Sequence, residues 1–97
     1  MDIKIEAVHF DADKKLVDFV NSRVEKLEHY FDSIVSSEVH LKLGSSSDKG
    51  NKVTEIKLSV PGKELFAKKE SKSFEESTDL CVEALRRQVT KHKEKIK

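Results

Sequence analysis

Residues 52–70, KVTEIKLSVPGKELFAKKE, decide the fold, because their pattern predicts two strands joined by a tight turn. Apolar and polar residues alternate on both sides of Pro61-Gly62, as they do in strands with one buried face. Proline presets φ at the first corner of a turn, and glycine accepts the positive φ of the second. We therefore predict a hairpin with strands over 52–60 and 63–70. Its inward residues are Thr54, Ile56, Leu58, Val60, Leu65 and Ala67.

The segments before this hairpin predict two more strands and a helix. Alternation predicts strands over 2–8 and 38–43, and the polar loop 44–51 links the second of these to the hairpin. Between them, Asp11 and Asp13 offer side-chain oxygens to cap a helix that begins near Lys14. The apolar residues expected to face the core are Ile3, Ile5, Ala7, Leu16, Phe19, Val20, Val24, Leu27, Phe31, Val39, Leu41 and Leu43.

A second helix is predicted over 73–95, where apolar residues recur at helical spacing. The order β-α-β-β-β-α predicts an α+β fold with two layers. We expect a four-stranded, mostly antiparallel sheet with both helices on one face, similar to the double-stranded RNA-binding domain. Residues 1–97 are expected to form a single domain. The stripe of the second helix is Phe74, Thr78, Cys81, Leu85, Val89, His92 and Ile96.

The composition excludes several classes of protein. No apolar run approaches the roughly 20 residues that span a bilayer, and the alternating N-terminus is unlike a signal peptide. Cys81 is the single cysteine, so the chain has no disulfide framework of its own. We therefore expect a cytoplasmic protein with no membrane partner.

No pattern of catalytic residues stands out. The four histidines have no metal-ligand spacing to one another or to Cys81, and phosphate-loop and nucleophile-elbow motifs are missing. His92 and Cys81 fall on the helix stripe, which favours packed structural roles. Asp79 is interpreted as a helix-surface charge or a local hydrogen-bond partner. We expect no enzyme, no cofactor, no metal and no small-molecule substrate.

Charge is distributed unevenly along the second helix, although the whole chain carries only +1. Residues 70–83 hold five acidic residues and one lysine, a net of −4, whereas residues 86–97 hold six basic residues and one glutamate, a net of +5. A local basic patch is the electrostatic requirement for binding nucleic acid. The candidate phosphate contacts are Arg86, Arg87, Lys91, Lys93, Lys95 and Lys97 on this helix, with Arg23 and Lys26 on the first.

The same charge pattern has a second interpretation. Acidic residues early and basic residues late in a helix complement its macrodipole, and lysine and arginine also keep surfaces soluble. The residues alone therefore leave open a nucleic-acid-binding domain and a protein-interaction or oligomerising domain. Phe66, on the polar face of its strand, is interpreted as an exposed aromatic residue without a specific role.

Four stretches of the chain resemble the ribosome hibernation-promoting factor family, which includes the ribosome-associated inhibitor A proteins. They follow one another in the family's order and spacing over nearly the whole sequence. These stretches are His9-Phe10, Arg23-x-x-Lys26-Leu27-Glu28 before Tyr30, Leu58-x-x-Pro61-Gly62-x-x-Leu65-x-Ala67, and Leu85-x-Arg87-Gln88-Val89-x-Lys91-x-Lys93-Glu94-Lys95.

The resemblance implies a translation-silencing factor that occupies the decoding region of the small ribosomal subunit. Such a factor blocks messenger RNA and transfer RNA at the A and P sites by occlusion, with basic helix faces on ribosomal RNA. Family positions match at Arg23, Lys26, Arg87, Lys91 and Lys95, and Lys93 matches many members. Arg86 and Lys97 are added from charge alone.

The chain also departs from the family's pattern. Members often carry an acidic residue at Arg86, and Ser73-Phe74-Glu75 replaces an Asp-Met-Tyr-like helix start. The 97 residues include neither a second domain nor an acidic tail, so we expect the short form of the family, monomeric when free. A generic module for double-stranded RNA remains an alternative, because such modules share this layout of helices on a sheet.

Overall fold

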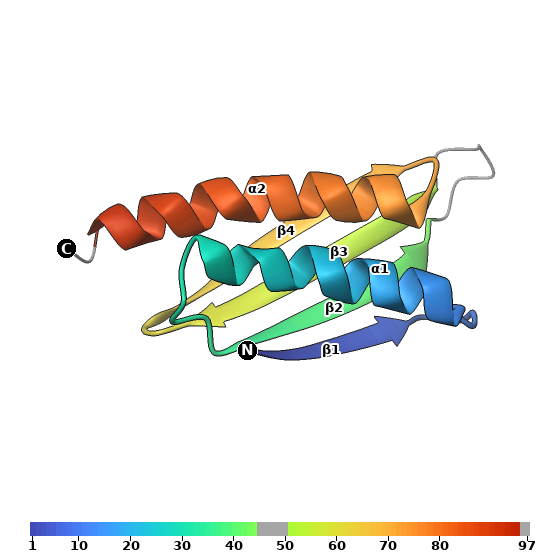
Figure 1. Ribbon diagram of the computed structural model, residues 1–97. Coiled ribbons are helices and arrows are strands. Elements are labelled where there is room, and N and C mark those ends of the chain that lie inside the picture. The colour runs from blue at the N-terminus through green and yellow to red at the C-terminus, as the bar shows by residue number, and fades with distance from the viewer. Residues whose placement is uncertain (45–50, 96–97) are drawn as a thin grey trace.

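The computed structural model describes residues 1–44 and 51–95, which form one sheet covered by two helices (Figure 1). The elements follow one another in the predicted order. Their bounds are β1 Asp2–Ala7, α1 Lys14–Glu25, the 3₁₀ helix η1 Lys26–His29, β2 Ser36–Leu43, β3 Lys52–Val60, β4 Lys63–Ser71 and α2 Phe74–Lys95.

The sheet has the strand order β1-β2-β3-β4, with β1 parallel to β2 and the other two pairings antiparallel. Between β3 and β4, Val60 pairs with Lys63 across the predicted turn, where Gly62 has a φ of +80°. That value suits glycine because it has no Cβ to clash with the backbone. The α+β fold with a mostly antiparallel sheet is thereby confirmed.

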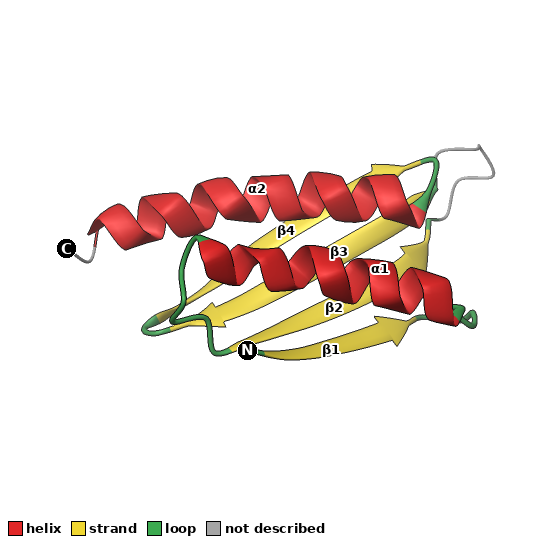
Figure 2. Ribbon diagram, in the orientation of Figure 1, coloured by secondary structure: helices red, strands yellow, loops and turns green. Residues whose placement is uncertain are grey.

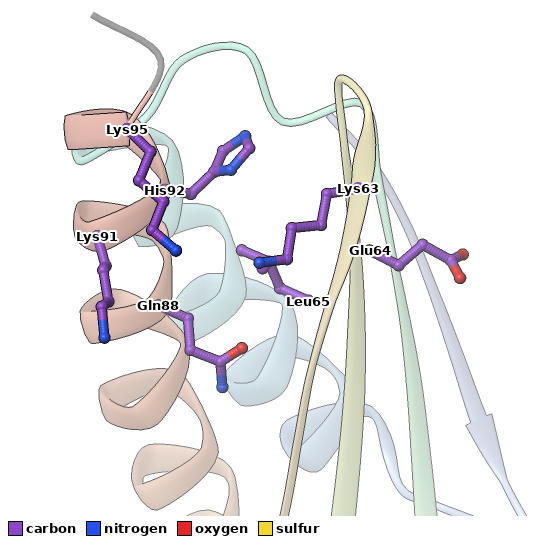
Figure 3. A pocket seen from close by; sticks show the side chains of 7 residues that line it. All are labelled: Lys63, Glu64, Leu65, Gln88, Lys91, His92 and Lys95. Atoms are coloured by element: carbon purple, nitrogen blue, oxygen red, sulfur yellow. The ribbon is translucent and has the colours of Figure 1, made fainter.

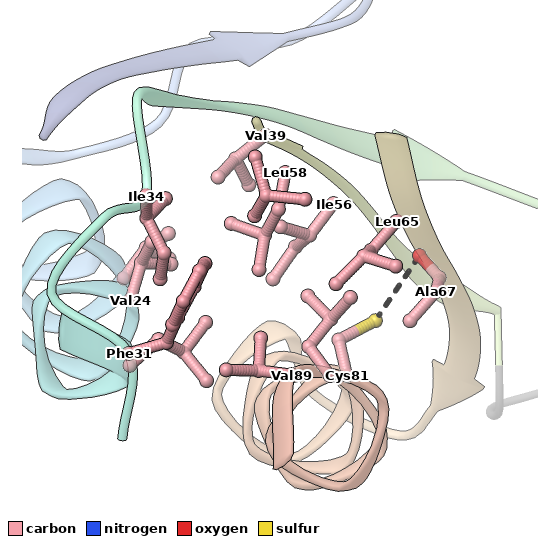
Figure 4. Packing of buried hydrophobic residues seen from close by; sticks show 14 of the residues in the cluster. Val24, Phe31, Ile34, Val39, Ile56, Leu58, Leu65, Ala67, Cys81 and Val89 are labelled. Atoms are coloured by element: carbon pink, nitrogen blue, oxygen red, sulfur yellow. Dashed lines mark hydrogen bonds between the residues drawn. The ribbon is translucent and has the colours of Figure 1, made fainter. Parts of the chain in front are cut away.

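Both helices cover the same face of the sheet (Figure 2). Each begins at a capping side chain: the main-chain amide of Leu16 donates to Asp13 Oδ1 at 2.8 Å, and that of Glu76 donates to Ser73 Oγ at 3.1 Å. The core between the layers joins inward residues of the strands to the helix stripes (Figure 4). Its fully buried members include Val20, Val24, Leu27, Val39, Leu41, Ile56, Leu58, Leu85 and Val89.

A polar seam lies beneath the first turns of α2. The hydroxyl of Thr54 on β3 forms buried hydrogen bonds with those of Ser77 at 2.7 Å and Thr78 at 3.3 Å. The Cys81 thiol lies 3.0 Å from the main-chain oxygen of Thr54 and 3.7 Å from that of Ala67 (Figure 4). Burial raises the pKa of Cys81 to about 11, so the thiol stays protonated at neutral pH. The interpretation of Cys81 as a core residue is confirmed.

The structure corrects the sequence prediction at three places. Helix α1 ends at Glu25, so Leu27 reaches the core from η1 and Phe31 from the segment after it. Strand β2 begins at Ser36, two residues before the predicted start. Leu43, predicted to face the core, is 49% exposed at the end of β2, beyond the helix layer. Ile96, Lys97 and most of the predicted polar loop lie outside the described residues.

Candidate nucleic-acid interface

The predicted phosphate contacts of α2 that the structure describes lie in the last three turns of the helix, which is exposed there on two flanks. One flank faces η1 and the other faces the start of β4. The buried stripe of Leu85, Val89 and His92 separates them. The structure places Arg86 and Lys93 on the first flank, and Lys91 and Lys95 on the second.

On the flank that faces η1, Arg86 lies over the ring of Tyr30, with Cζ 5.7 Å from the ring centroid. This distance falls within the range of a cation–π contact. Arg86 also donates from Nε to Glu83 Oε2 at 3.1 Å. Lys93 lines a shallow hollow beside Tyr30 and Asp32, farther along the same flank. An aromatic ring and two cations therefore lie together where η1 meets α2.

On the other flank, Lys91 and Lys95 line a cavity of about 140 Å³ between α2 and the start of β4. Lys63, the first residue of β4, extends from the strand toward the helix and lines the same cavity (Figure 3). Gln88 joins the two elements, since its Nε2 donates to the main-chain oxygen of Phe66 at 2.9 Å. None of the three lysines forms an ion pair with another residue in the described part of the chain.

His92 belongs to the wall of this cavity and to the core. Its ring packs edge-on against Phe31, with centroids 5.6 Å apart, and only 9% of the residue is exposed. The Nε2 atom is buried without a hydrogen-bond partner in residues 1–44 and 51–95. The interpretation of His92 as a packed structural residue is confirmed.

The remaining two candidates are Arg23 and Lys26, of which only Arg23 lies on α1, because the helix ends at Glu25. Arg23 donates from Nε to Asp79 Oδ1 of α2 at 2.9 Å and lies 4.5 Å from the centroid of Phe19. Asp79, interpreted from sequence as a surface charge or local partner, therefore bridges the two helices. Lys26 begins η1, is exposed, and has no ion pair with any described residue.

The candidate cations thus fall into two groups, according to whether a carboxylate lies close to them. Every candidate arginine is close to a carboxylate: Arg23 to Asp79, and Arg86 and Arg87 to Glu83, the last at 3.7 Å. The candidate lysines that the structure describes have no such partner. The hydrogen bond from Arg86, followed by its charge and that of Arg87, holds the pKa of Glu83 below its ordinary value of 4.5. This carboxylate is therefore ionised at neutral pH.

The open face of the sheet has a different electrostatic character. Its outward positions carry six carboxylates against four lysines, a net charge of −2. Cross-strand ion pairs neutralise most of them: Lys57 lies 3.8 Å from both Glu38 and Glu64, and Glu55 lies 3.1 Å from Lys42 and 3.7 Å from Lys68. Phe66 is 53% exposed among these charges, as the sequence predicted.

Lys63 is the residue that the sequence analysis missed. Its position alternates in step with Leu65 and Ala67, so its side chain is on the face of the sheet that the helices cover. A lysine at such an inward position next to a turn is the sequence feature that could have identified it. Residues 1–44 and 51–95 contain no group of three His, Cys, Asp or Glu side chains that could hold a metal ion. They also contain no helix both long and apolar enough to cross a membrane.

Solved structures of other proteins share the fold. The Thermus thermophilus Protein Y N-terminal domain matches with a TM-score of 0.83 and 24% identity, over 95% of this chain and 99% of that one. A ribosomal subunit interface protein from Coxiella burnetii matches with a TM-score of 0.84 and 20% identity, over 96% and 98%. At these identities the likeness concerns the fold.

Sequence comparison identifies the family. The ribosome hibernation promoting factor of Escherichia coli K12 is 33% identical over 97 residues, which are 100% of this chain and 98% of that protein. The factor of that name from Pseudomonas putida is 30% identical over 95 residues, 98% and 89% of the two chains. A family model matches residues 3–97. The resemblance noted in the sequence is confirmed, and the chain belongs to the sigma 54 modulation protein / S30EA ribosomal protein family.

Proposed function

We propose that this protein is a ribosome hibernation factor that binds the small ribosomal subunit at its decoding region and blocks translation by occlusion. Its relatives are named ribosome hibernation promoting factors. The observation that carries the proposal is the end of α2, where residues 86–95 hold five cations and one carboxylate, a net of +4. Cations that contact phosphates release condensed counterions, which gives affinity without base recognition.

The distribution of charge supports the helix side as the RNA-binding face. The open face of the sheet is net negative and internally paired, so it would repel an RNA backbone. On the helix side, the candidate lysines that the structure describes have no ion-pair partner among the described residues and can pair with phosphates at little cost. We propose that the contacts are made by Arg23, Lys26, Arg86, Arg87, Lys91, Lys93 and Lys95, in a cytoplasmic protein that is monomeric when free and acts without catalysis or cofactor.

Co-sedimentation with vacant small subunits tests the proposal. The double variant Arg87→Glu/Lys91→Glu should lower affinity at least about 50-fold at ~0.1 M salt, because each lost phosphate contact removes a factor of roughly eight. Lys4→Glu/Lys72→Glu makes the same change in net charge away from this end of α2, and it should bind like the unmodified chain. Both proteins should show unaltered circular dichroism spectra. Full binding by Arg87→Glu/Lys91→Glu would refute the assigned contact surface.

Two competitors separate occlusion of the decoding region from other modes of binding. Transfer RNA should displace the protein from the subunit if their sites overlap. A free RNA duplex should compete poorly, whereas competition as strong as that of whole subunits would indicate a generic module for double-stranded RNA. Binding that does not weaken with salt would indicate a protein-interaction domain instead, since phosphate contacts are strongly salt-dependent.

A further inference from the structure

We infer that the cavity between the start of β4 and the last turns of α2 is a binding site for a single phosphate group of the RNA backbone, with Lys63 as a contact. This inference rests on the proposed function and extends its contact surface to a second element. The cavity of about 140 Å³ has room for a tetrahedral oxyanion with some of its water, since one water occupies about 30 Å³ in the liquid.

Three of the four charged residues that line the cavity are lysines. Lys63, Lys91 and Lys95 line it, and none is neutralised by a carboxylate of the described chain. Glu64, the acidic residue in the lining, has its carboxylate 3.8 Å from Lys57 and points away from the helix (Figure 3). Ammonium groups that lie near one another repel, and an anion bound between them would offset this repulsion because it attracts each of them. Lysine is an established point-charge ligand of phosphate.

The apolar floor and walls of the cavity strengthen the electric field of the lysines. Leu65 is 4% exposed at the base, and the buried ring of His92 lies against Phe31 beside it. A cleft lined by one sign of charge with walls of low dielectric concentrates the field within it. The hydrogen bond from Gln88 to Phe66 holds α2 against β4, so the lysine backbones are positioned before an anion arrives.

Chain topology explains why such a site can form only in the folded protein. Lys63 follows the Pro61-Gly62 turn and takes an inward position opposite Val60. Its side chain therefore emerges on the helix side, under the end of α2 (Figure 3). Lys69, at another inward position of β4, is opposite Thr54, which contacts the first turns of α2. Lys63 is thus the lysine of β4 that joins the cations at the C-terminal end of α2.

The first experiment is a titration of ¹⁵N-labelled protein with inorganic phosphate, followed by NMR. Amide signals of Lys63, Gln88, Lys91 and Lys95 should shift together, with saturation, and to a larger extent than signals from the open face of the sheet. In Lys63→Ala the shifts of the three helix residues should weaken at least about threefold. The control Lys4→Ala removes an exposed lysine from the other face and should titrate like the unmodified chain.

The second experiment measures affinity for vacant small subunits as a function of salt. Loss of one phosphate contact in Lys63→Ala should weaken binding about eightfold at ~0.1 M salt and reduce the log–log salt slope by about 0.9, whereas Lys4→Ala should change neither. Equal behaviour of the two variants in both experiments would overturn the inference. A phosphate effect without a change on subunits would also overturn it, because the cavity would then hold only an adventitious anion.

The two proposals fail in distinguishable ways. If Lys63→Ala binds subunits normally while Arg87→Glu/Lys91→Glu does not, the cavity is not an RNA contact and the proposed function stands. If the unmodified protein does not bind subunits at any salt concentration, the proposed function fails, and the inference fails with it, even where inorganic phosphate still shifts the four signals.

Discussion

The two halves of α2 meet the rest of the molecule in different ways. The first half, residues 74–84, stacks Phe74 on Phe10 and forms buried hydrogen bonds to Thr54. Two of its carboxylates, those of Asp79 and Glu83, pair with arginines. The second half, residues 85–95, keeps the apolar stripe but surrounds it with cations. One helix therefore combines an anchor for the fold with a charged surface, because the side of a helix that faces the core repeats every three to four residues whatever the other sides carry.

The comparison also shows that the arginines and the lysines differ in their partners. Guanidinium groups form directional hydrogen bonds to carboxylates. Arg86 forms a forked pair of them with Glu83, and Arg23 donates one to Asp79. The lysines near the end of the helix have no such partners in the described chain. We interpret the lysines as side chains that can bind RNA phosphates as soon as the RNA approaches. The arginines must first give up their carboxylate partners before they can bind a phosphate.

The largest expected effect tests the anchoring role of the first half. Phe74→Ala removes a ring that is 8% exposed and stacks on Phe10 with centroids 5.0 Å apart. It should lower the free energy of unfolding by about 3–5 kcal/mol, measured by urea denaturation. The matched control Phe66→Ala removes an exposed ring from the open face and should change stability by less than about 0.5 kcal/mol. Similar losses in both variants would contradict the assigned division of roles.

A smaller effect is expected when the carboxylates of the first half are neutralised. Asp79→Asn/Glu83→Gln frees Arg23, Arg86 and Arg87, so affinity for small subunits should rise about three- to tenfold at low salt, because exposed ion pairs are individually weak. Isothermal titration at two salt concentrations measures the change. The control Glu38→Gln/Glu64→Gln removes the same charge from the open face. A fall in affinity would instead mean that the carboxylates hold the arginines in a productive position.

The smallest expected effect concerns acid pH. The pKa of Glu83 is held below its ordinary 4.5, first by the hydrogen bond from Arg86, so ionised Glu83 stabilises the folded state above about pH 4.5. That contribution is lost as pH falls through the lower folded pKa. Glu83→Gln should therefore flatten the acid side of the stability curve slightly, since the pair is exposed to solvent. A carboxyl signal of Glu83 that titrates at 4.5 or above would contradict this prediction.

Local patterns explain why much of the fold could be predicted. Alternation in residues 52–70 specifies which side of each strand is buried, and Pro61-Gly62 specifies where the chain reverses. The end of α1 was harder to predict, because Leu27 and Phe31 continue its apolar spacing although the chain tightens into η1 after Glu25. A 3₁₀ turn still delivers side chains three residues apart to one side, so periodicity alone cannot distinguish it from another α-helical turn.

The sequence by itself determined the strand faces, the helix stripes and the reversal of charge along α2, because each is a property of neighbouring residues. Only the tertiary structure decided which charges meet. Arg23 and Asp79 are 56 residues apart and pair because α1 and α2 pack side by side. Lys63 joins Lys91 and Lys95 because β4 begins beneath the end of α2. Coulomb interactions depend on separation in space, and the packing of the core sets that separation.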